Sequence, residues 1–433
     1  MDTTTVKLGL LGCGTVGSAL ARLLEGQREL IAARTGVRLE ITRIAVRDTS
    51  KARDVAVSDD VFTTDTMSVV EDPDVDVIVE LIGGVDVARE LVGRALALGK
   101  PVVTGNKALL AAHGAELYAA ADAAGVDLLF EAAVAGGIPL MRPLRESLVG
   151  EPVTRVMGII NGTTNYILTR MTEAGASYED ALAEAQELGY AEEDPTADVE
   201  GFDAGAKAAI IATIVYGAIV SDDQVHHEGI SSITSDDIEV AARLGFAVKA
   251  IAVVEGSVAD GDTSVAVRVH PALVPLDHPL ASVRDSFNAV FIEGDSVGDL
   301  MLYGRGAGGA PTASAVLGDV IDAAVNLSRG TSARFGPLAP ATVRPIAESS
   351  SAFFLRVAVM DQPGVLAQVA DVFGRHGVSI RSMEQHGLGD QAVLMFITHV
   401  SVEAEVQSTL DELRGLDSVN DIHSVIRVVG GES

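Results

Sequence analysis

The sequence has little cysteine, no tryptophan and few basic residues. Its one cysteine, Cys13, cannot form a disulfide within the chain, so we expect the protein to work in the reducing cytoplasm. Among 433 residues, 31 Lys and Arg stand against 61 Asp and Glu, a net charge of −30. Such a surplus of negative charge repels nucleic-acid phosphates and anionic membrane surfaces. We therefore expect neither nucleic acid nor a membrane as a partner.

The sequence also lacks a long hydrophobic run. Its most apolar stretch, residues 208–220, is too short to cross a bilayer, which takes about 20 residues in a helix. Residues 1–14 show no basic segment followed by an apolar run, so we expect no signal peptide. With 48% hydrophobic and 21% charged residues, the chain predicts a globular protein of about three domains.

The first third of the chain alternates short apolar runs with stretches whose apolar residues recur at helical spacing. This alternation predicts a parallel sheet covered by helices on both faces, in the α/β class. We expect residues 1–135 to form this domain, with a return segment at about 304–326. The expected strands are residues 7–11, 39–46, 75–81, 102–104 and 128–131, and the expected helices are residues 18–30, 86–98 and 112–124.

The rest of the chain divides where its character changes. Strand-like and apolar helical segments predict an α+β domain over residues 136–303, and residues 327–351, with several Pro and Gly and no sustained period, predict a linker. In residues 352–433 the elements follow the order βαββαβ, which predicts a ferredoxin-like fold. The expected strands there are residues 353–360, 379–385, 392–399 and 422–429, and the expected helices are residues 364–376 and 402–413.

A glycine-rich turn follows the first expected strand. Gly12, Gly14 and Gly17 form a Gly-X-Gly-X-X-Gly pattern directly before an expected helix. Here the first glycine permits a tight turn, the second lets backbone amides reach a pyrophosphate, and the third lets helix and strand pack closely. Together with the expected parallel sheet, the pattern predicts a Rossmann-type domain that binds a dinucleotide, with an ordinary glycine-rich turn as the alternative.

The residues after the second expected strand bear on which dinucleotide binds. Arg47 would accept the 2′-phosphate of NADP, whereas Asp48 would accept the 2′-hydroxyl of NAD. Arg47 comes first, and Lys51 and Arg53 follow, which favours NADP. The alternative is that all four are charges of a solvated loop.

Two lysines are candidates for chemistry. Lys107 follows the strand expected at residues 102–104, at the edge where open α/β sheets bind ligands. Lys207 opens the most apolar helix, and Asp203 precedes it by four residues, so the two would share a helix face. The acidic stretch 179–203 would keep Lys207 protonated, which suits a proton donor. The alternatives are a surface charge at Lys107 and a helix-surface ion pair at Lys207.

Two turns rich in small residues remain ambiguous. Residues 131–138 end the last expected strand with a carboxylate and then small residues, which leave carbonyl oxygens open to a hard cation. From the pattern alone, a tight crossing between domains is the favoured interpretation of that turn. Residues 304–312 form either a second loop of backbone amides near the cofactor or a hinge. No set of His and Cys has the spacing of a zinc site.

Taken together, these motifs resemble the homoserine dehydrogenases of the monofunctional bacterial type, which end in an ACT domain. The resemblance covers essentially the whole chain, and the spacing of Glu192, Asp198, Asp203 and Lys207 is specific to that family. Gly105 departs from the family's more usual alanine. The segments that show the resemblance are LGLLGCGTVGSAL, ELIGG, VVTGNKALLA, FEAAVAGGIPL, GIINGTTNYILTRM, GYAEEDPTADVEGFDAGAK, GRGAGGAPTASAVLGDVI and VAVMDQPGVLAQVADVF.

The resemblance implies interconversion of L-aspartate 4-semialdehyde and L-homoserine with NADP or NAD, on the threonine, methionine and isoleucine pathway. It implies that Lys207 protonates the carbonyl oxygen as hydride arrives and acts as the base in reverse. That role is physically coherent because an ammonium both stabilises and neutralises the charge that develops on oxygen. Asp203 would orient substrate or lysine, Glu192 and Asp198 would bind substrate, and Lys107 would lie where cofactor and substrate meet.

The resemblance also implies other ligands. A monovalent cation, usually sodium, would be held chiefly through carbonyl groups, at Glu131, Val134, Gly136 and Ile138. The cofactor would contact Gly12, Gly14, Thr15, Val16, Gly17, Arg47, Lys107, Gly189 and Gly308.

Two expectations concern assembly and regulation. By the resemblance, the second domain would form the interface of a homodimer or homotetramer, and the ACT domain would bind L-threonine as a feedback effector near residues 361–366. We expect a chain that ends at about Ser351 to remain catalytically competent and to be insensitive to threonine, because the tail has its own expected sheet.

Two other functions are compatible with the residues themselves. One is another NAD(P)-dependent dehydrogenase of amino-acid metabolism, and the other is a nonenzymatic sensor of nucleotide and amino acid. Lys207 beside Asp203, together with Glu192, argues against the sensor, because a sensor needs no proton donor. Assay of aspartate semialdehyde reduction distinguishes the first alternative.

Overall fold

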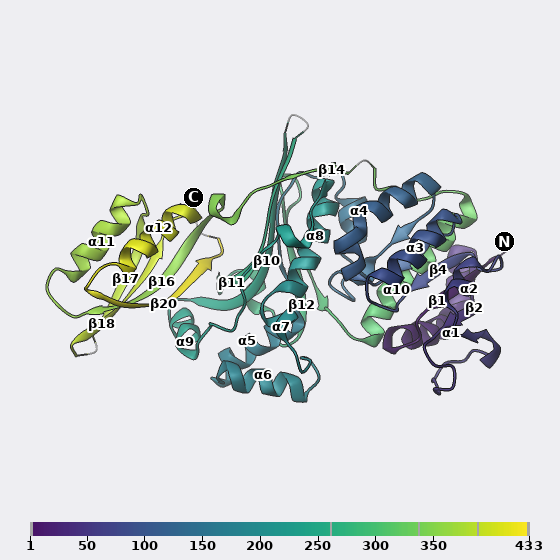
Figure 1. The fold of residues 1–433 in the computed structure, drawn as a ribbon, viewed down its shortest axis with the longest axis horizontal. Helices are drawn as coiled ribbons and strands as arrows, with labels where there is room; N and C mark the ends of the chain where they lie inside the picture. Colours follow the sequence, from purple (N-terminus) through teal and green to yellow (C-terminus); the bar gives the residue numbers. More distant parts are fainter. Residues whose placement is uncertain (1–2, 260–261, 337, 388, 431–433) are drawn as a thin grey trace.

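Three regions follow one another along the long axis of the molecule, with the N-terminal domain at one end and the C-terminal tail at the other (Figure 1). The computed structural model describes residues 3–259, 262–336, 338–387 and 389–430. The regions follow the order of the chain except for helix α10 (Gly309–Arg329), which returns to pack against the N-terminal domain.

The N-terminal domain is a parallel six-stranded sheet in the order β3-β2-β1-β4-β5-β6. Leu8, Leu10 and Ile78 are fully buried, as expected of strands that helices cover on both faces. This confirms the predicted Rossmann-type sheet. Its elements are β1 (Thr4–Leu11), α1 (Thr15–Thr35), β2 (Val37–Ala45), β3 (Phe62–Thr63), α2 (Thr66–Glu71), β4 (Val77–Glu80), α3 (Asp86–Ala97), β5 (Val102–Thr104), α4 (Lys107–Ala124) and β6 (Leu128–Leu129). Sequence reasoning missed β3 and α2, which are too short to show a period.

The middle region is built on a long, mostly antiparallel sheet in the order β13-β12-β7-β10-β11. Helix α8 (Phe202–Tyr216) packs between this sheet and the N-terminal domain, so its apolar residues are buried on nearly every side. The other elements are β7 (Val153–Ile159), α5 (Gly162–Ala174), α6 (Tyr178–Glu187), α7 (Thr196–Val199), β8 (Ala218–Ile219), β9 (His226–His227), α9 (Ser235–Arg243), β10 (Phe246–Ala259), β11 (Asp262–Pro275), β12 (Phe287–Gly294) and β13 (Gly298–Arg305).

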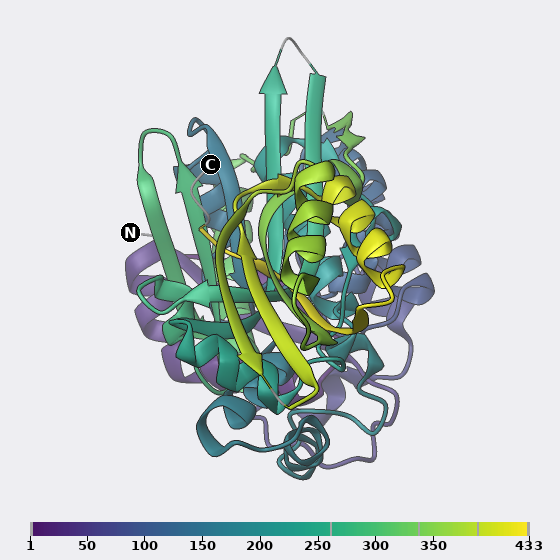
Figure 2. The same cartoon turned by 90° about the vertical axis from the view of Figure 1, so that its left-hand side faces the viewer.

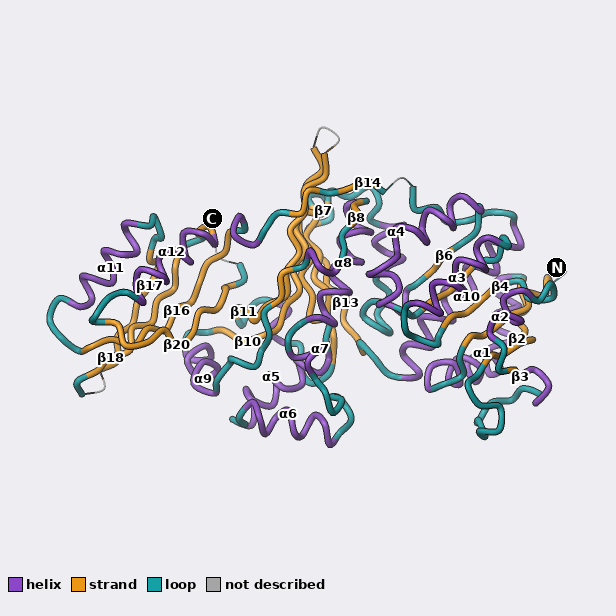
Figure 3. The backbone as a smooth tube through the Cα atoms, viewed as in Figure 1, coloured by secondary structure: helices purple, strands orange, loops and turns teal. Residues whose placement is uncertain are grey.

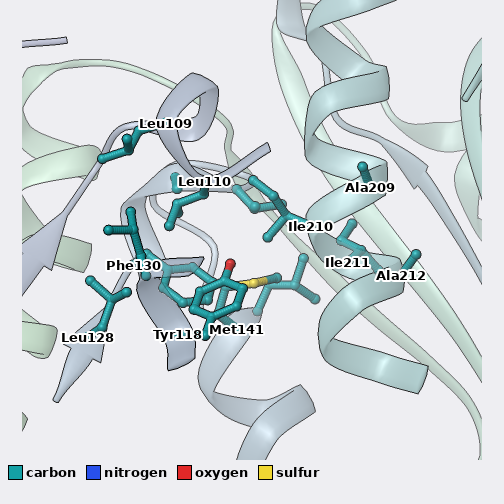
Figure 4. Packing of buried hydrophobic residues seen from close by; sticks show 14 of the residues in the cluster. Leu109, Leu110, Tyr118, Leu128, Phe130, Met141, Ala209, Ile210, Ile211 and Ala212 are labelled. Carbon is teal, nitrogen blue, oxygen red and sulfur yellow. The ribbon is translucent and has the colours of Figure 1, made fainter. Parts of the chain in front are cut away.

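One hydrophobic core joins the two regions. Figure 4 shows Ile210 of α8 directed toward Leu110, Tyr118 and residues around them in the N-terminal domain, and Ile211 belongs to the same buried cluster. All of these side chains are buried. Because α8 contributes to this shared core, it holds the start of the helix, with Asp203 and Lys207, at a fixed position relative to the N-terminal domain.

The C-terminal tail has the antiparallel order β20-β16-β18-β17, with two helices packed side by side (Figure 2). This confirms the predicted order βαββαβ. Alternate residues of β16, such as Phe353 and Leu355, face a core of their own with Val369 and Leu410 of the helices. The elements are β16 (Ser350–Met360), α11 (Val365–Arg375), β17 (Ile380–Gly387), β18 (Gln391–Thr398), β19 (Ser401–Val402), α12 (Glu403–Arg414) and β20 (Val419–Val428).

The sheet of the tail continues the sheet of the middle region. β20 pairs in parallel with β11, with Ala272 opposite Arg427 and Leu273 opposite Val428 (Figure 3). The segment expected to be a linker is attached to the same region, since β14 (Ala339–Pro340) pairs with β8 and β15 (Thr342–Val343) pairs with β11. The sequence did not indicate these pairings, because strand edges join through backbone groups that every residue has. Residue 337 of that segment lies outside the described residues.

Within the part of the chain that the structure describes, no helix combines the length and apolar character needed to span a membrane.

Candidate active site

The turn from β1 to α1 has the geometry that its glycines predict. Gly12 adopts a left-handed backbone with φ of +103°, and a Cβ there would lie 2.7 Å from the carbonyl oxygen of Leu81. A Cβ on Gly17 would collide with the carbonyl oxygen of Gly12. Gly14 precedes α1 without a capping side chain, and an added Cβ there would meet no atom within 4 Å. The turn therefore presents open backbone amides to a ligand.

A second helix begins beside this turn. Gly308 precedes α10 with φ of +118°, again without a capping side chain. A Cβ on Gly309 would lie 2.9 Å from Cγ2 of Thr15, in the first turn of α1. The uncapped N-termini of α1 and α10 thus meet, and both favour negative charge. Of the two interpretations of residues 304–312, this arrangement favours the loop of backbone amides.

The loop after β2 lies next to the glycine turn, because Gly12 N donates a hydrogen bond to Ala45 O at 2.9 Å. Arg47 is exposed and, among the described residues, its guanidinium makes no hydrogen bond or ion pair. Asp48 instead accepts hydrogen bonds from the hydroxyl and amide of Ser50, at 2.7 and 2.8 Å. The Ser50 hydroxyl is the main reason that the pKa of Asp48 lies below its usual value.

The two candidate lysines meet at one carboxylate. Asp203 Oδ1 lies 2.7 Å from Lys107 Nζ, and Asp203 Oδ2 lies 2.7 Å from Lys207 Nζ. Lys207 also donates to the carbonyl oxygen of Ile160 at 2.7 Å. The side chains of Lys207 and Asp203 are 12% and 9% exposed, whereas Lys107 is 44% exposed. The predicted pairing along one helix face is present and buried, and Lys107 joins it from the N-terminal domain.

Charge rather than burial decides the state of the central carboxylate. Burial would raise the pKa of Asp203, but the ammonium groups of Lys207 and Lys107 outweigh that effect and hold the pKa well below its usual value. Asp203 is therefore an anion at any physiological pH.

Sequence reasoning missed two residues of this cluster. Asn161 Nδ2 donates to Asp198 Oδ1 at 2.6 Å and to Asp203 Oδ2 at 2.8 Å, while its Oδ1 caps α5. Thr163 donates to the carbonyl oxygen of Tyr190 at 2.7 Å. The available signal was Asn161 directly before a helix, a favoured capping residue. Asn161 fixes the positions of the two carboxylates relative to α5.

Glu192 is not part of the cluster. It lies in the exposed loop between α6 and α7, and among the described residues its carboxylate makes no hydrogen bond or ion pair. The loop starts at Gly189, with φ of +76°, and Gln186 donates to the Glu192 carbonyl oxygen at 3.0 Å. The structure therefore joins Asp198, Asp203, Lys207 and Lys107 and leaves Glu192 with a carboxylate free to accept a ligand.

The carboxylate of Glu131, in the turn after β6, is hydrogen-bonded within the protein. Glu131 accepts hydrogen bonds from the amides of Leu140, Met141 and Arg142, the last two at 2.7 and 2.9 Å. Its own amide donates to Asp319 of α10 at 2.7 Å. The carboxylate of Glu131 is thus occupied by the amides at the start of the next helical turn. Only the backbone carbonyl group of Glu131 remains for a cation.

The carbonyl groups of this turn are open. Among the described residues, no backbone or side-chain donor bonds to the carbonyl oxygens of Glu131, Val134, Gly136 or Ile138, although all four residues are buried. Gly136 has φ of +56°, and a Cβ there would collide with Gly306. Buried carbonyl oxygens without donors are unusual and suit a cation that prefers oxygen ligands.

The parts lie along one edge of the N-terminal sheet, since Gly12 follows β1 and Lys107 follows β5. Leu81 lies between them, because a Cβ on Gly105 would be 3.5 Å from its Cδ2. That distance is an ordinary contact, so the alanine usual in the family would fit. A Rossmann-type sheet with an open glycine turn beside a buried aspartate that pairs with two lysines defines a nicotinamide-nucleotide-dependent oxidoreductase.

Three family descriptions match successive parts of the chain: the NAD-binding domain of homoserine dehydrogenase over residues 12–131, homoserine dehydrogenase over residues 139–321, and the ACT domain over residues 353–418. The homoserine dehydrogenase of Corynebacterium glutamicum is 48% identical, over 98% of this chain and 96% of that protein. The enzyme of Synechocystis is 44% identical over 98% of this chain and all of that protein.

Solved structures agree. A homoserine dehydrogenase from Thiobacillus denitrificans superposes with a TM-score of 0.92 at 39% identity, covering 99% of each chain. A hyperthermophilic archaeal homoserine dehydrogenase in complex with NADPH has a TM-score of 0.63 at 30% identity, over 76% of this chain and all of that one. The chain belongs to the homoserine dehydrogenase family. It is an oxidoreductase with a nicotinamide cofactor and an ACT regulatory domain, which decides against the nonenzymatic sensor and the other dehydrogenases.

Proposed function

We propose that the enzyme reduces L-aspartate 4-semialdehyde to L-homoserine, reversibly, with Lys207 as the acid. The supporting observation is the placement of its ammonium group. Two of its three N–H donors are taken by Ile160 O and Asp203 Oδ2, which leaves the third for a substrate oxygen. When bound, the cofactor supplies hydride to the carbonyl carbon.

Lys207 transfers its proton to the aldehyde oxygen as negative charge develops there, and the neutral amine takes the proton back in the reverse reaction. Asp203 orients Lys207, and Lys107 pairs with the other carboxylate oxygen of Asp203. We propose that Asp198 and Glu192 bind the amino group of the substrate, since Asn161 holds Asp198 within the cluster and, among the described residues, the carboxylate of Glu192 makes no hydrogen bond or ion pair. Assay of purified protein with semialdehyde and reduced nucleotide tests the direction, and absence of oxidation of the nucleotide would refute the proposal.

We propose NADP as the preferred cofactor, because Arg47 is free for a 2′-phosphate while Asp48 is bonded to Ser50. The Arg47→Ser variant should bind NADPH about tenfold more weakly and NADH unchanged, since a hydrogen bond to a charged group contributes about 1.5–3 kcal/mol. Fluorescence titration with each nucleotide measures this, with Arg34→Ser, an exposed arginine in the last turn of α1, as the control. An equal loss of affinity for both nucleotides, or no loss of affinity for either, would count against the assignment.

We propose that Glu131, Val134, Gly136 and Ile138 hold a sodium ion through their carbonyl oxygens, as the four open carbonyl groups suggest. The ion would stiffen the turn that contacts Gly306 and thereby the loop before α10. With choline replacing sodium at equal ionic strength, we expect kcat/KM to fall several-fold and to recover when sodium is added. Equal rates in the two salts would refute a functional sodium site.

We propose that L-threonine inhibits the enzyme by binding to the ACT domain at the turn of residues 361–366. Gly364, with φ of +91°, leads into α11 without a capping side chain, and among the described residues no hydrogen bond is donated by the amides of Gly364 and Leu366. Coupling requires that threonine bind one conformation more tightly than another. A rate that does not change with added threonine would exclude this proposal.

We also propose two or four copies of the chain per molecule, acting in the cytoplasm. β13 is the edge strand of the central sheet, and its Tyr303 is 54% exposed, which makes this edge a candidate contact in the middle region. Light scattering on the purified protein gives the mass, and the mass of a single chain would contradict the proposal.

A further inference from the structure

A cavity of about 210 Å³ lies where residues 343–349 pass over β9 and β11 on their way into the tail. We call it the junction cavity. Its polar side chains come from four parts of the chain: Gln224 of the turn at residues 222–224, His226 of β9, Arg268 of β11, and Arg344 and Ser349 of the connecting segment. Small apolar side chains form the remaining walls. It lies apart from the residues of the active site and from the turn at residues 361–366.

The junction cavity gathers polar atoms that lack partners. In the described part of the chain, seven buried side-chain nitrogen or oxygen atoms have no hydrogen-bond partner, and three of them are Arg268 Nε, Arg344 Nε and Ser349 Oγ. Arg268 is 5% exposed, and its two terminal nitrogens are used by Glu255 at 2.9 and 3.1 Å. Its Nε–H remains without an acceptor. Two guanidinium N–H groups and a hydroxyl at one place call for a ligand with acceptor oxygens.

Charge supports the same ligand class. Glu255 balances Arg268, but among the described residues Arg344 forms no ion pair within 4 Å. An arginine without a direct ion pair beside a cavity is unusual in a chain with a net charge of −30, and the one carboxylate among the described residues that its charge acts on, Glu255, already binds Arg268. An anion would balance Arg344 and satisfy the free donors together.

The junction cavity touches both the tail and the active-site helix. His226 Nε2 lies 2.8 Å from Glu228, which binds Arg427 of β20, and Glu403 of the tail donates its amide to Ser349 O at 2.9 Å. The next residue along β9, His227, packs on Phe202 with ring centres 4.9 Å apart. Phe202 precedes Asp203 directly. A ligand in the junction cavity would contact His226, and the next residue of β9, His227, contacts α8.

We propose that the junction cavity binds a small oxyanion, a carboxylate or a phosphate group of a metabolite, and that the bound anion strengthens the attachment of the tail to the central sheet. The free donors would bond to its oxygens, and its body would contact the apolar walls. This ligand site is separate from the threonine site of the ACT domain and from the phosphate-binding turns of the cofactor.

Titration calorimetry of the full chain with inorganic phosphate, and separately with acetate, tests the proposal. Saturating NADPH is present so that the cofactor's own phosphate sites are filled, and chloride keeps the ionic strength constant. We expect one site per chain, at least tenfold weaker binding in Arg344→Met and in Ser349→Ala, and normal binding in Arg334→Met. Arg334 lies in the same connecting segment but lines a different cavity, and none of the three residues is in the active site.

The outcomes separate the possible ligands. Binding of phosphate alone indicates a phosphate-bearing metabolite, binding of acetate alone indicates a carboxylate, and binding of both indicates a site for either. No binding of either anion, or binding that all three variants leave unchanged, overturns the proposal, and water then satisfies the free donors. Thermal unfolding is the second measurement: the bound anion should raise the midpoint in the wild type and in Arg334→Met but not in Arg344→Met.

Discussion

We expect the Lys207→Ala variant to lose about 10²- to 10⁴-fold in kcat, the range typical of a lost general acid. The cause is the missing proton donor, since the other ammonium of the cluster, on Lys107, bonds to the opposite oxygen of Asp203. Affinity for NADPH should change little, because the contacts of Lys207 are to Ile160 and Asp203 and not to the glycine turn. Steady-state kinetics and fluorescence titration measure the two effects.

Two further variants make the result specific. Lys207→Arg keeps the positive charge but gives up its proton far less readily, so it should also be slow while binding substrate. Lys100→Ala, which removes a lysine whose one hydrogen bond among the described residues is to the carbonyl oxygen of Asp72, should remain active. Near-normal turnover in Lys207→Ala would remove the assignment of Lys207 as the acid, whatever its effect on KM.

We expect the Arg427→Met variant to loosen the tail. Arg427 is 7% exposed and bonds to Glu228 of the middle region at 2.7 and 2.8 Å and to Glu403 of the tail at 2.8 and 3.0 Å. Its removal leaves two carboxylates facing each other. The cost should be about 3 kcal/mol, the lower end for a broken buried pair, because Glu228 is 37% exposed. Urea unfolding and hydrogen exchange of β20 measure it.

The pH dependence of this loss follows from Glu228. Burial would raise the pKa of Glu228, but hydrogen bonds from His226 and Arg427 and the charge of Arg427 hold it well below its usual value. A carboxylate with a lowered pKa stabilises the fold above its unfolded pKa of about 4.3, and that contribution is lost as the pH falls. The difference in free energy of unfolding between wild type and Arg427→Met should therefore be largest near neutral pH and become smaller below about pH 4.

The control for the tail is Arg414→Met, which breaks an exposed ion pair with Asp411 on α12. Such pairs contribute little, so its stability should match the wild type. Equal stability of Arg427→Met and wild type across the pH range would show that β20 pairing alone holds the tail. The same contacts modify our expectation for a chain ending at Ser351: it would expose the edge of β11 and leave Glu228 without Arg427, so we expect it to be less stable as well as insensitive to threonine.

The glycine turn and the ends of the parallel strands could be predicted from the sequence because both depend on local geometry. Gly12 and Gly17 have no room for a side chain. Lys107 comes three residues after the end of β5, a strand whose neighbours in the sheet are parallel to it. Asp203 and Lys207 could be paired because residues four apart share a helix face. Each of these predictions depends only on residues within about one helical turn of the residue concerned.

The sequence by itself determined the Rossmann-type sheet, the order of elements in the tail and the Asp203–Lys207 pair, because periodicity and spacing act over short stretches of chain. Three features became known only from the tertiary structure. Lys107 and Asn161 contact Asp203, the carboxylate of Glu131 accepts hydrogen bonds from backbone amides, and β20 pairs with β11. Those contacts connect residues far apart in the sequence, and their formation depends on how hydrophobic cores place the elements, which no local pattern specifies.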